Sequence, residues 1–356
     1  MATRLKIALL FGGRSGEHEV SVRSAESVAQ GLSSRFDVLP VLIDHGGRWW
    51  LQKEGPAVMP TGGVPVFVVP SPEDKGALRR LDDAQVAARP DVYFPVLHGT
   101  YGEDGTIQGL LELAGVPFVG SGTAASAGAM DKVLMKALFA AANLPQAPYR
   151  VLLARDRSNA AALVEPLGLP VFVKPANLGS SVGVSKVKTA GALGAALDVA
   201  FAYDRKVVVE AAVPGAREIE IAVLGNDDAK ASIPGEIIPD REFYDYDSKY
   251  SADSKTVLEI PAPLDAAATE EVRRVAVDVF RSVDASGYAR VDFLMEKATG
   301  KLVVNEINTI PGFTSISMFP KLWGATGIAY EDLLERLVQL GLERQRERAS
   351  LKTDYS

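Results

Sequence analysis

Short apolar runs alternate with amphipathic stretches along this chain, and the pattern predicts a protein of mixed strands and helices. Runs of strand length are expected at residues 5–11, 38–43, 64–69, 91–97, 170–174, 207–210, 218–224, 288–297 and 301–308. Helical periodicity is expected at residues 20–32, 106–114, 131–142, 266–285 and 330–348. Because the first strand is followed by a glycine turn and then a helix, we expect the chain to open with a parallel α/β sheet. Ligands of such sheets bind at the carboxyl ends of the strands.

The segment 287–318 carries most of the chemical information, because it contains a predicted hairpin. Its two strands are joined by a loop that ends in Gly300, a residue that adopts positive φ at no steric cost. A straight antiparallel register pairs residues of one face as follows: Lys297 with Lys301, Asp292 with Glu306, and Arg290 with Asn308. The opposite face is apolar, and we expect it to be core: Ala289, Val291, Phe293, Met295, Val303 and Ile307.

Two carboxylates that face each other across a sheet repel, and apolar surroundings make their ionisation costly unless a cation lies between them. Asp292, Glu306 and Asn308 offer only oxygen ligands, which suit a hard ion such as Mg²⁺ or Mn²⁺. Magnesium usually shares its coordination shell with substrate phosphates, so the pattern indicates a nucleotide site. The alternative is an edge hairpin with solvated acidic residues, and the surrounding Val, Leu, Phe and Ile residues oppose it.

Polar loops follow three other predicted strands and are candidate ligand-binding segments. Glu17 lies in the first loop, at the expected crevice of the opening sheet. His98 begins the second loop, where the sequence is consistent with either a structural role or ligand contact. The third loop, residues 177–184, combines two glycines with two serines, so its donor groups could close over a triphosphate.

The third loop also carries the pattern G-x-S-x-G around Ser181, which is typical of a serine hydrolase elbow. Two observations oppose that alternative. The loop leads into a predicted strand rather than a helix, and all three histidines of the chain precede the serine. The chain contains no G-K-[ST] sequence, so a P-loop nucleotide site is not expected either.

The chain has 356 residues, 47% of them hydrophobic, so it can bury a large core, and its length suggests two or three domains. A formal net charge of -7 argues against nucleic acid or an anionic membrane surface as the main partner. The absence of cysteine excludes disulfides, thiolate catalysis and cysteine-bound zinc. The first residues lack a signal-peptide pattern and no apolar run reaches membrane-spanning length, so we expect a soluble cytoplasmic protein.

Residues 239–255 are aromatic and charged and lack the periodicity of a core element. A stretch of this kind between strands is typical of an ordered functional loop or a mobile lid. Lys249 and Tyr250 are its best candidates for contact with a ligand.

Several motifs occur in an order that resembles the D-alanine-D-alanine ligase family of the ATP-grasp superfamily: FGGRSGEHEVS, HGTYGEDG, MDK, VKPANLGSSVGVSKV, FYDYDSKY, RVDF and NEINTIPGFTSISM. The resemblance spans almost the whole chain. It implies an α/β ATP-grasp fold with three domains: an N-terminal parallel α/β domain (1–127), a central lid domain (128–214) and a C-terminal domain with the metal site (215–356). It also implies that ATP phosphorylates the carboxylate of one D-alanine. The amine of a second D-alanine then attacks the acyl phosphate, and the dipeptide serves peptidoglycan synthesis.

The resemblance further implies which residues bind ATP and metal. Lys132 and Lys174 would hold phosphates while the loop of Ser180 and Ser181 closes above them. The other nucleotide contacts that it implies are Glu210 to the adenine amino group, Glu218 to the ribose, Val213 in the connector between these two acids, and Lys249. The metal ligands that it implies are those of the hairpin argument, Asp292, Glu306 and Asn308, with two ions expected.

For the substrates, the resemblance implies that Glu17 would bind the ammonium of the first D-alanine and would itself be held by Ser180 and Tyr250. Arg290 and the backbone N–H of Gly312 would stabilise the oxyanion of the tetrahedral intermediate. These five residues are the expected catalytic set. Tyr250 also favours a dipeptide product, because relatives that make D-alanyl-D-lactate often carry histidine in its place.

Ser317 and the amide of Met318 would hold the carboxylate of the second D-alanine, and His98 is included as a substrate contact because of its position at a strand end. The family suggests a homodimer, and activation by K⁺ stays open. Two further alternatives remain. One is an ATP-grasp ligase for a different acid and amine, and the other is a nucleotide-binding regulatory protein without turnover, which Arg290 beside the metal face opposes.

Overall fold

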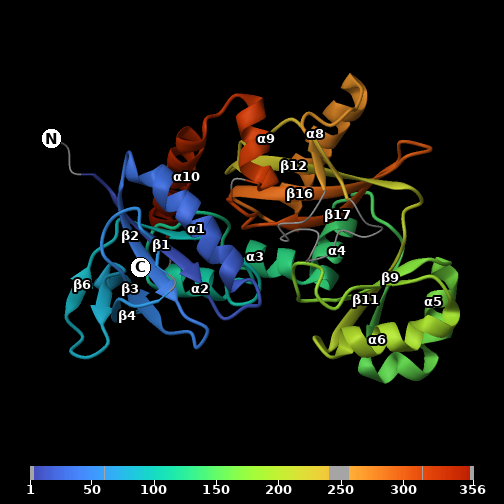
Figure 1. The fold of residues 1–356 in the computed structure, drawn as a ribbon, viewed down its shortest axis with the longest axis horizontal. Coiled ribbons are helices and arrows are strands. Elements are labelled where there is room, and N and C mark those ends of the chain that lie inside the picture. Colours follow the sequence, from blue (N-terminus) through green and yellow to red (C-terminus); the bar gives the residue numbers. More distant parts are fainter. Residues whose placement is uncertain (1–3, 60, 240–255, 315, 353–356) are drawn as a thin grey trace.

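The computed structural model describes residues 4–59, 61–239, 256–314 and 316–352. The strands of these residues form three sheets, which we call the N-terminal, central and C-terminal sheets (Figure 1). The predicted loop contacts Lys249 and Tyr250 lie outside the described residues. Within the described residues, no helix is both long enough and apolar enough to cross a membrane.

The N-terminal sheet has seven strands in the order β6-β5-β4-β3-β2-β1-β7. Their bounds are Lys6–Gly12 (β1), Asp37–Ile43 (β2), Trp49–Leu51 (β3), Val64–Val68 (β4), Leu78–Arg80 (β5), Val86–Ala88 (β6) and Val92–Pro95 (β7). Strand β1 is parallel to both β2 and β7, which confirms the predicted parallel opening. Strands β3 to β6 extend this sheet in antiparallel fashion. The helices of this part are α1 (His18–Ser33), α2 (Thr106–Leu113) and α3 (Thr123–Met130).

The central sheet is antiparallel and has the order β10-β9-β11-β8. Its strands are β8 (Tyr149–Leu153), β9 (Val171–Pro175), β10 (Ser185–Val187) and β11 (Lys206–Ala211), and helices α5 (Ala160–Val164) and α6 (Leu193–Phe201) pack on it (Figure 1). Helix α4 (Lys132–Ala141) precedes this sheet, yet its Met135 and Phe139 belong to the hydrophobic cluster of the C-terminal sheet. Short 3₁₀ helices occupy connections at Pro72–Asp74, Ala154–Asn159, Glu165–Leu167 and Ala190–Ala192.

The C-terminal sheet has six strands, in the order β15-β14-β12-β16-β17 with β13 beside β12. Their bounds are Ala216–Gly225 (β12), Lys230–Ala231 (β13), Gly235–Ile238 (β14), Val257–Glu259 (β15), Gly287–Glu296 (β16) and Leu302–Asn308 (β17). Helix α8 (Ala266–Ser282) buries an apolar stripe that includes Val272, Val279 and Phe280 in the cluster of this sheet. Helices α9 (Met318–Thr326) and α10 (Tyr330–Ser350) follow β17.

The predicted hairpin is present as β16 and β17, and its register contains one irregularity. Asp292 lies opposite Glu306, as predicted, but a bulge follows on the side of the turn, and Phe293 pairs with Val304. Asn305 is therefore the extra residue, and the N–H of Glu296 donates to the carbonyl of Lys301 at 2.9 Å. The predicted pairing of Lys297 with Lys301 is thus wrong by one residue. The bulge also places Leu302 and Val304 in the core cluster in which we expected Val303.

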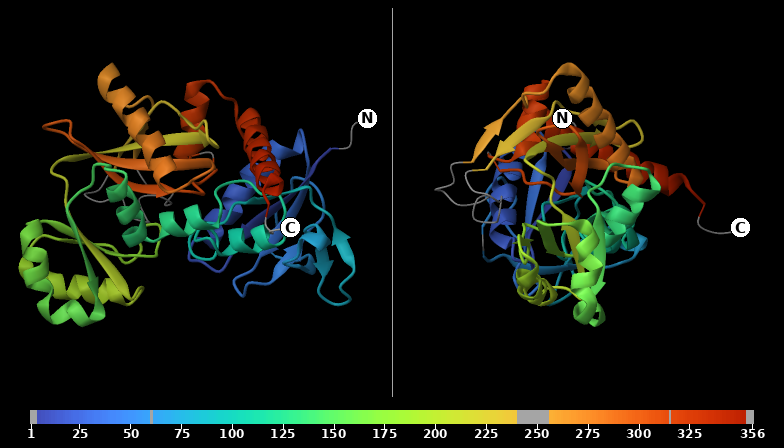
Figure 2. Two further views of the ribbon diagram at one scale, coloured as in Figure 1. Left: turned by 180° about the vertical axis from the view of Figure 1, so that it is seen from behind. Right: turned by 90° about the vertical axis from the view of Figure 1, so that its right-hand side faces the viewer.

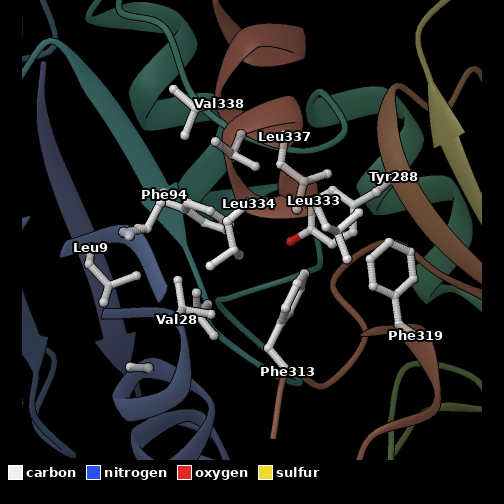
Figure 3. Close-up of a cluster of buried hydrophobic side chains, with 14 of the residues drawn as sticks. Leu9, Val28, Phe94, Tyr288, Phe313, Phe319, Leu333, Leu334, Leu337 and Val338 are labelled. Atoms are coloured by element: carbon white, nitrogen blue, oxygen red, sulfur yellow. The ribbon is translucent and has the colours of Figure 1, made fainter. Parts of the chain in front are cut away.

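Helix α10 returns to the N-terminal sheet and joins the two ends of the chain in one core (Figures 1 and 3). The members of this core that Figure 3 labels are Leu9, Val28, Phe94, Tyr288, Phe313, Phe319, Leu333, Leu334, Leu337 and Val338. Phe313 lies in the loop that follows β17 and is fully buried, with its ring 5.6 Å from that of Tyr288. Its ring also lies 6.3 Å from that of Phe94 on β7, so this anchor places the loop beside β7. The view from behind in Figure 2 shows the central sheet set apart from this core.

Candidate active site

Two cavities adjoin where the three sheets meet. The larger, of about 620 Å³, lies between the loops of the N-terminal sheet and the loop after β17, and the smaller, of about 360 Å³, lies between the central and C-terminal sheets. Both volumes suit small-molecule ligands. The residues that line both cavities are Lys132, Leu178, Gly179, Ser180, Glu220 and Glu306. The two cavities therefore have part of their walls in common.

The larger cavity brings together most of the predicted substrate residues: Glu17, His98, Ser180, Arg290, Gly312, Ser317 and Met318. Glu17 lies at the start of α1, where helix N-termini favour a carboxylate. The hydroxyl of Ser180 donates to Glu17 Oε1 from the loop between β9 and β10. A Cβ atom at Gly99 would lie 2.7 Å from Glu17 Oε2, and one at Gly179 would lie 2.9 Å away, so the two glycines let the backbone approach this carboxylate closely. The three segments thus close around one carboxylate.

His98 is buried, and both of its ring nitrogens have protein partners. Its Nδ1 lies 3.0 Å from the carbonyl oxygen of Ile310, and its Nε2 lies 3.1 Å from Oγ of Ser24. Burial lowers the pKa of His98 below its ordinary value, so the neutral ring donates from Nδ1 and accepts at Nε2. His98 therefore ties α1 to the loop after β17. Its contact with substrate stays a prediction.

The start of α9 faces the larger cavity. Ser317 precedes the first helical residue, and its Oγ lies 3.0 Å from the N–H of Thr314 and 2.8 Å from Oγ1 of the same residue. The N–H of Met318 has no partner within the helix, because the first helical N–H groups have no preceding carbonyl. The side chain of Met318 is buried in the core. This geometry suits the predicted hold on a substrate carboxylate.

Arg290 and Asp292 form a bidentate ion pair on the face of β16 that borders the two cavities. Arg290 Nε donates to Asp292 Oδ1 at 2.6 Å, and Nη2 donates to Oδ2 at 2.6 Å. Arg290 Nε also lies 3.0 Å from Glu220 Oε2 on β12, and Asn308 Nδ2 donates to Asp292 Oδ2 at 3.1 Å. Burial alone would lower the pKa of Arg290, but Asp292 and Glu220 raise it well above its ordinary value.

The donor set of the predicted metal site fits a hard divalent ion. Asp292, Glu306 and Asn308 occupy adjacent register positions and offer only oxygen ligands, as Mg²⁺ and Mn²⁺ prefer. The guanidinium of Arg290 neutralises Asp292 at present, so a metal ion would compete with it for this carboxylate. Among the described residues, no group of three acidic, histidine or cysteine side chains could hold an ion. The predicted set contains two acids and an amide and does not require such a group.

The smaller cavity collects the predicted nucleotide residues that the structure describes: Lys132, Lys174, Ser180, Ser181, Glu210, Val213 and Glu218. Lys132 Nζ donates to the carbonyl of Leu178 at 2.7 Å. Lys174 Nζ donates to Glu210 Oε2 at 2.7 Å. Burial opposes the ionisation of Glu210, but Lys174 and Lys136 lower its pKa below the ordinary value. The loop that contains Ser181 continues into strand β10, which opposes a hydrolase elbow at that serine.

Three charged residues of the site were absent from the predictions. Lys136 contacts Glu210, Glu220 contacts Arg290, and Glu103 lines the larger cavity with its Oε1 2.8 Å from the N–H of Gly99. Burial and the charge of Glu17 raise the pKa of Glu103 to about 8. Periodicity offered two signals. Lys136 is four residues after Lys132 on a helix, and Glu220 is two residues after Glu218 on a strand, so each shares a face with a predicted residue.

The three sheets and the two adjoining cavities define an α/β protein of the ATP-grasp fold. Residues 6–121 match the family model described as the N-terminus of D-ala D-ala ligase, and residues 138–339 match the one described as its C-terminus. The chain belongs to the D-alanine-D-alanine ligase family.

Similar proteins cover this chain almost completely. The D-alanine-D-alanine ligase of Heliobacterium modesticaldum is 51% identical over 358 residues, which cover 98% of this chain and 97% of the relative. A solved D-alanine-D-alanine ligase from Coxiella burnetii is 35% identical with a TM-score of 0.84 and covers 98% of this chain and 97% of its own. The solved VanG D-Ala:D-Ser ligase from Enterococcus faecalis is 34% identical with a TM-score of 0.86 and covers 95% of this chain and 100% of its own. The fold alone therefore does not fix the second substrate.

Proposed function

We propose that this chain joins two D-alanine molecules to D-alanyl-D-alanine, with conversion of ATP to ADP and phosphate, for peptidoglycan precursor synthesis. Membership of the D-alanine-D-alanine ligase family supports this function. One observation carries it: the cavity lined by the predicted substrate residues shares Ser180 and Glu306 with the cavity lined by the predicted nucleotide residues.

ATP occupies the smaller cavity in this proposal. Its phosphates take Lys132 and Lys174 away from their present partners, the carbonyl of Leu178 and the carboxylate of Glu210. The adenine amino group donates to Glu210, and the ribose hydroxyls donate to Glu218. The γ-phosphate then points toward Glu306, where the two cavities meet.

The first D-alanine lies in the larger cavity with its ammonium on Glu17. A carboxylate oxygen of this substrate attacks the γ-phosphorus of ATP. The new O–P bond forms as the bond from the γ-phosphorus to ADP breaks, which gives an acyl phosphate and ADP. The protein supplies position and charge neutralisation in this step, as is general for phosphoryl transfer.

The second D-alanine binds with its carboxylate on the Ser317 hydroxyl and the Met318 N–H. Its amine attacks the acyl carbon, the carbonyl oxygen becomes an oxyanion, and loss of phosphate and of one amine proton gives the peptide bond. Arg290 and the N–H of Gly312 donate to the oxyanion, and one such donor contributes about 2.7–4 kcal/mol. Tyr250 remains the proposed determinant of the second substrate and lies outside the described residues.

Asp292, Glu306 and Asn308 would hold two Mg²⁺ or Mn²⁺ ions, and the oxygen-only donor set supports this assignment. When bound, such ions would neutralise charge on the transferred phosphoryl group and on ADP. Metal titration in the presence of K⁺ or Na⁺ tests the choice of divalent ion and the activation by K⁺. We also propose a homodimer that works in the cytoplasm, on the strength of the family resemblance, and sedimentation velocity tests the dimer.

Phosphate release with purified protein, ATP and Mg²⁺ tests the function. The acceptors compared are D-alanine, L-alanine, D-alanine with D-lactate, and D-alanine with D-serine, and mass spectrometry identifies each product. Release that depends on D-alanine, with the mass of D-alanyl-D-alanine, is the expected result. Turnover only with another pair would retain an ATP-grasp ligase with a different substrate, and the absence of turnover with every pair would favour the regulatory alternative.

A further inference from the structure

Glu210 lies between two lysines at the end of β11. It is 3% exposed, its Oε1 accepts from Nζ of Lys136, and its Oε2 accepts from Nζ of Lys174 at 2.7 Å. One carboxylate therefore has two cations as direct partners. Burial of a charged group is costly unless it is paired, so the function of the second cation requires an explanation.

The two lysines differ in their access to ligand. Lys174 lines the smaller cavity, and its side chain is 15% exposed and also lies 3.3 Å from Oδ1 of Asn305. The Lys136 side chain is 2% exposed, lies 5.1 Å from the centre of the Tyr149 ring, and is absent from the residues that line either cavity. A ligand can thus take Lys174 from Glu210, whereas Lys136 stays behind it.

A nucleotide in the smaller cavity would change the charge balance at Glu210. Once phosphates take Lys174, Glu210 keeps a cation only if Lys136 is present. Without Lys136, the buried carboxylate in this nucleotide-bound state would have no cation beside it and would take up a proton. A protonated carboxyl group donates a hydrogen bond, whereas an ionised one only accepts. The charge on Glu210 therefore decides whether it recognises a hydrogen-bond donor, such as an amino group, or an acceptor, such as a carbonyl oxygen, on the base.

We propose that Lys136 is a positioning residue for base recognition: it is the permanent counter-charge that keeps Glu210 an ionised acceptor for the adenine amino group while Lys174 serves the phosphates. This inference rests on the proposed use of ATP. It assigns the two cations of Glu210 to two different tasks. Lys136 acts only through Glu210 and touches no substrate.

The test compares the binding of ADP with that of inosine diphosphate, which carries an oxygen where adenine has its amino group. Isothermal titration calorimetry with Mg²⁺ at pH 6 to 9 measures both affinities in wild type and in Lys136→Met. Wild type prefers ADP at every pH. Lys136→Met loses this preference by roughly tenfold or more, because a hydrogen bond to a charged acceptor is lost, and the loss is greatest at low pH, where Glu210 takes up a proton. Unchanged preference in Lys136→Met would overturn the inference.

A matched control variant is Lys206→Met. Lys206 at the start of β11 pairs with Asp131, which caps α4 by accepting from the N–H of Val133 at 2.9 Å. This pair joins α4 to β11 as the pair of Lys136 does, but the partner of Lys206 is Asp131 rather than Glu210. Lys206→Met therefore loses stability and keeps the ADP preference. Equal loss of preference in both variants would assign a merely structural role to Lys136.

Two further variants separate the action of Lys136 from a folding defect. Lys136→Gln is a second neutral variant, and it loses the ADP preference as Lys136→Met does. In Glu210→Gln, the added change Lys136→Met has no further effect on the preference, because both act through one carboxylate. An additive loss would overturn the inference. Wild-type protein that binds neither nucleotide would instead contradict the proposed use of ATP.

Discussion

Arg290 holds Asp292 through two parallel hydrogen bonds of 2.6 Å on the same face of β16. Each residue has a predicted role that needs it to leave this pair. Asp292 is predicted to bind a metal ion, and Arg290 is predicted to donate to an oxyanion. A metal ion at Asp292 would compete with the guanidinium, whose other acidic partner in this structure is Glu220 at 3.0 Å. Metal binding and the release of Arg290 from Asp292 are therefore expected to be coupled through one carboxylate.

We therefore expect opposite effects of Arg290→Met on metal affinity and on turnover. Mn²⁺ is expected to bind more tightly to the free variant, because the guanidinium that competes for Asp292 is gone. The value of kcat falls about 10²–10³-fold, because one oxyanion donor is lost. Electron paramagnetic resonance measures Mn²⁺ affinity, and phosphate release measures kcat. Weaker Mn²⁺ binding would contradict the competition.

Arg217→Met is the matched control for this experiment. Arg217 forms a comparable bidentate pair with Glu236 one strand away, at 2.9 Å from Nε to Oε1 and 2.6 Å from Nη2 to Oε2. Neither residue lines a cavity. The control is expected to lose some stability and to keep both its Mn²⁺ affinity and its kcat.

The hydrogen bond from Ser180 to Glu17 predicts a selective loss of substrate affinity in Ser180→Ala. Glu17 would lose the donor that fixes its orientation, and a hydrogen bond to a charged group contributes about 1.5–3 kcal/mol. The KM for D-alanine is expected to rise roughly tenfold or more, with a smaller change in the KM for ATP. Steady-state kinetics with each substrate varied in turn measure both. A larger rise for ATP than for D-alanine would assign the serine to the nucleotide instead.

Glu306→Gln is expected to abolish turnover while the fold stays intact. The change removes one of two carboxylates from the predicted metal site and keeps the size of the side chain. Glu296→Gln on the same hairpin is the control, because Glu296 accepts from Thr299 Oγ1 at 2.6 Å and lines neither cavity. Phosphate release and circular dichroism are measured on both. Near-normal turnover of Glu306→Gln would remove this residue from the metal site.

Glu103 predicts a pH dependence of stability. Burial and the charge of Glu17 raise its pKa from 4.5 to about 8, Glu306 raises it further, and Arg290 and the N–H of Gly99 oppose them. Between pH 4.5 and about 8 the folded state binds a proton at Glu103 that the unfolded state has lost, so this group lowers the free energy of unfolding as pH rises. Glu103→Gln is expected to remove that slope and to be relatively more stable at pH 8. Urea unfolding from pH 5 to 9 measures it, and parallel profiles for the two proteins would contradict the assignment.

Local pattern was sufficient to predict the face of the hairpin that carries Asp292 and Glu306. It was not sufficient for the register at the turn, because the bulge at Asn305 is one extra residue that alternation does not reveal. The predicted register was correct for Asp292 and Glu306, because the extra residue at the bulge compensates for the one-residue error in the pairing at the turn. Strand β3 (Trp49–Leu51) shows a second limit, since three residues are too few to show periodicity.

The ion pairs among the charged residues of the site could not be predicted from the sequence, because they form between segments that only the tertiary structure brings together. Lys136 on α4 pairs with Glu210 on β11 although 74 residues separate them in the sequence. The pKa of Glu103 is raised because its side chain is buried near Glu17. Neither contact can be predicted from the spacing of these residues in the sequence. The resemblance to a family predicted which residues bind ligands, and the folded chain shows that Lys174, a predicted phosphate contact, is also a partner of Glu210.

Two helix glycines have different surroundings, which predict opposite effects of substitution by alanine. Gly31 in α1 faces α10, whereas Gly109 in α2 has room for a methyl group. A Cβ atom at Gly31 would lie 2.5 Å from Cδ1 of Leu334 and 2.9 Å from Cε1 of Tyr330, so Gly31→Ala overpacks this contact and costs about 1–3 kcal/mol. At Gly109 in α2 the nearest atom would lie 3.7 Å away, so Gly109→Ala gains about 0.5–1 kcal/mol of helix propensity. Denaturant unfolding measures both. Adding Leu334→Ala to Gly31→Ala is expected to cost less than Leu334→Ala costs alone, because the new methyl group fills part of the space that the leucine leaves.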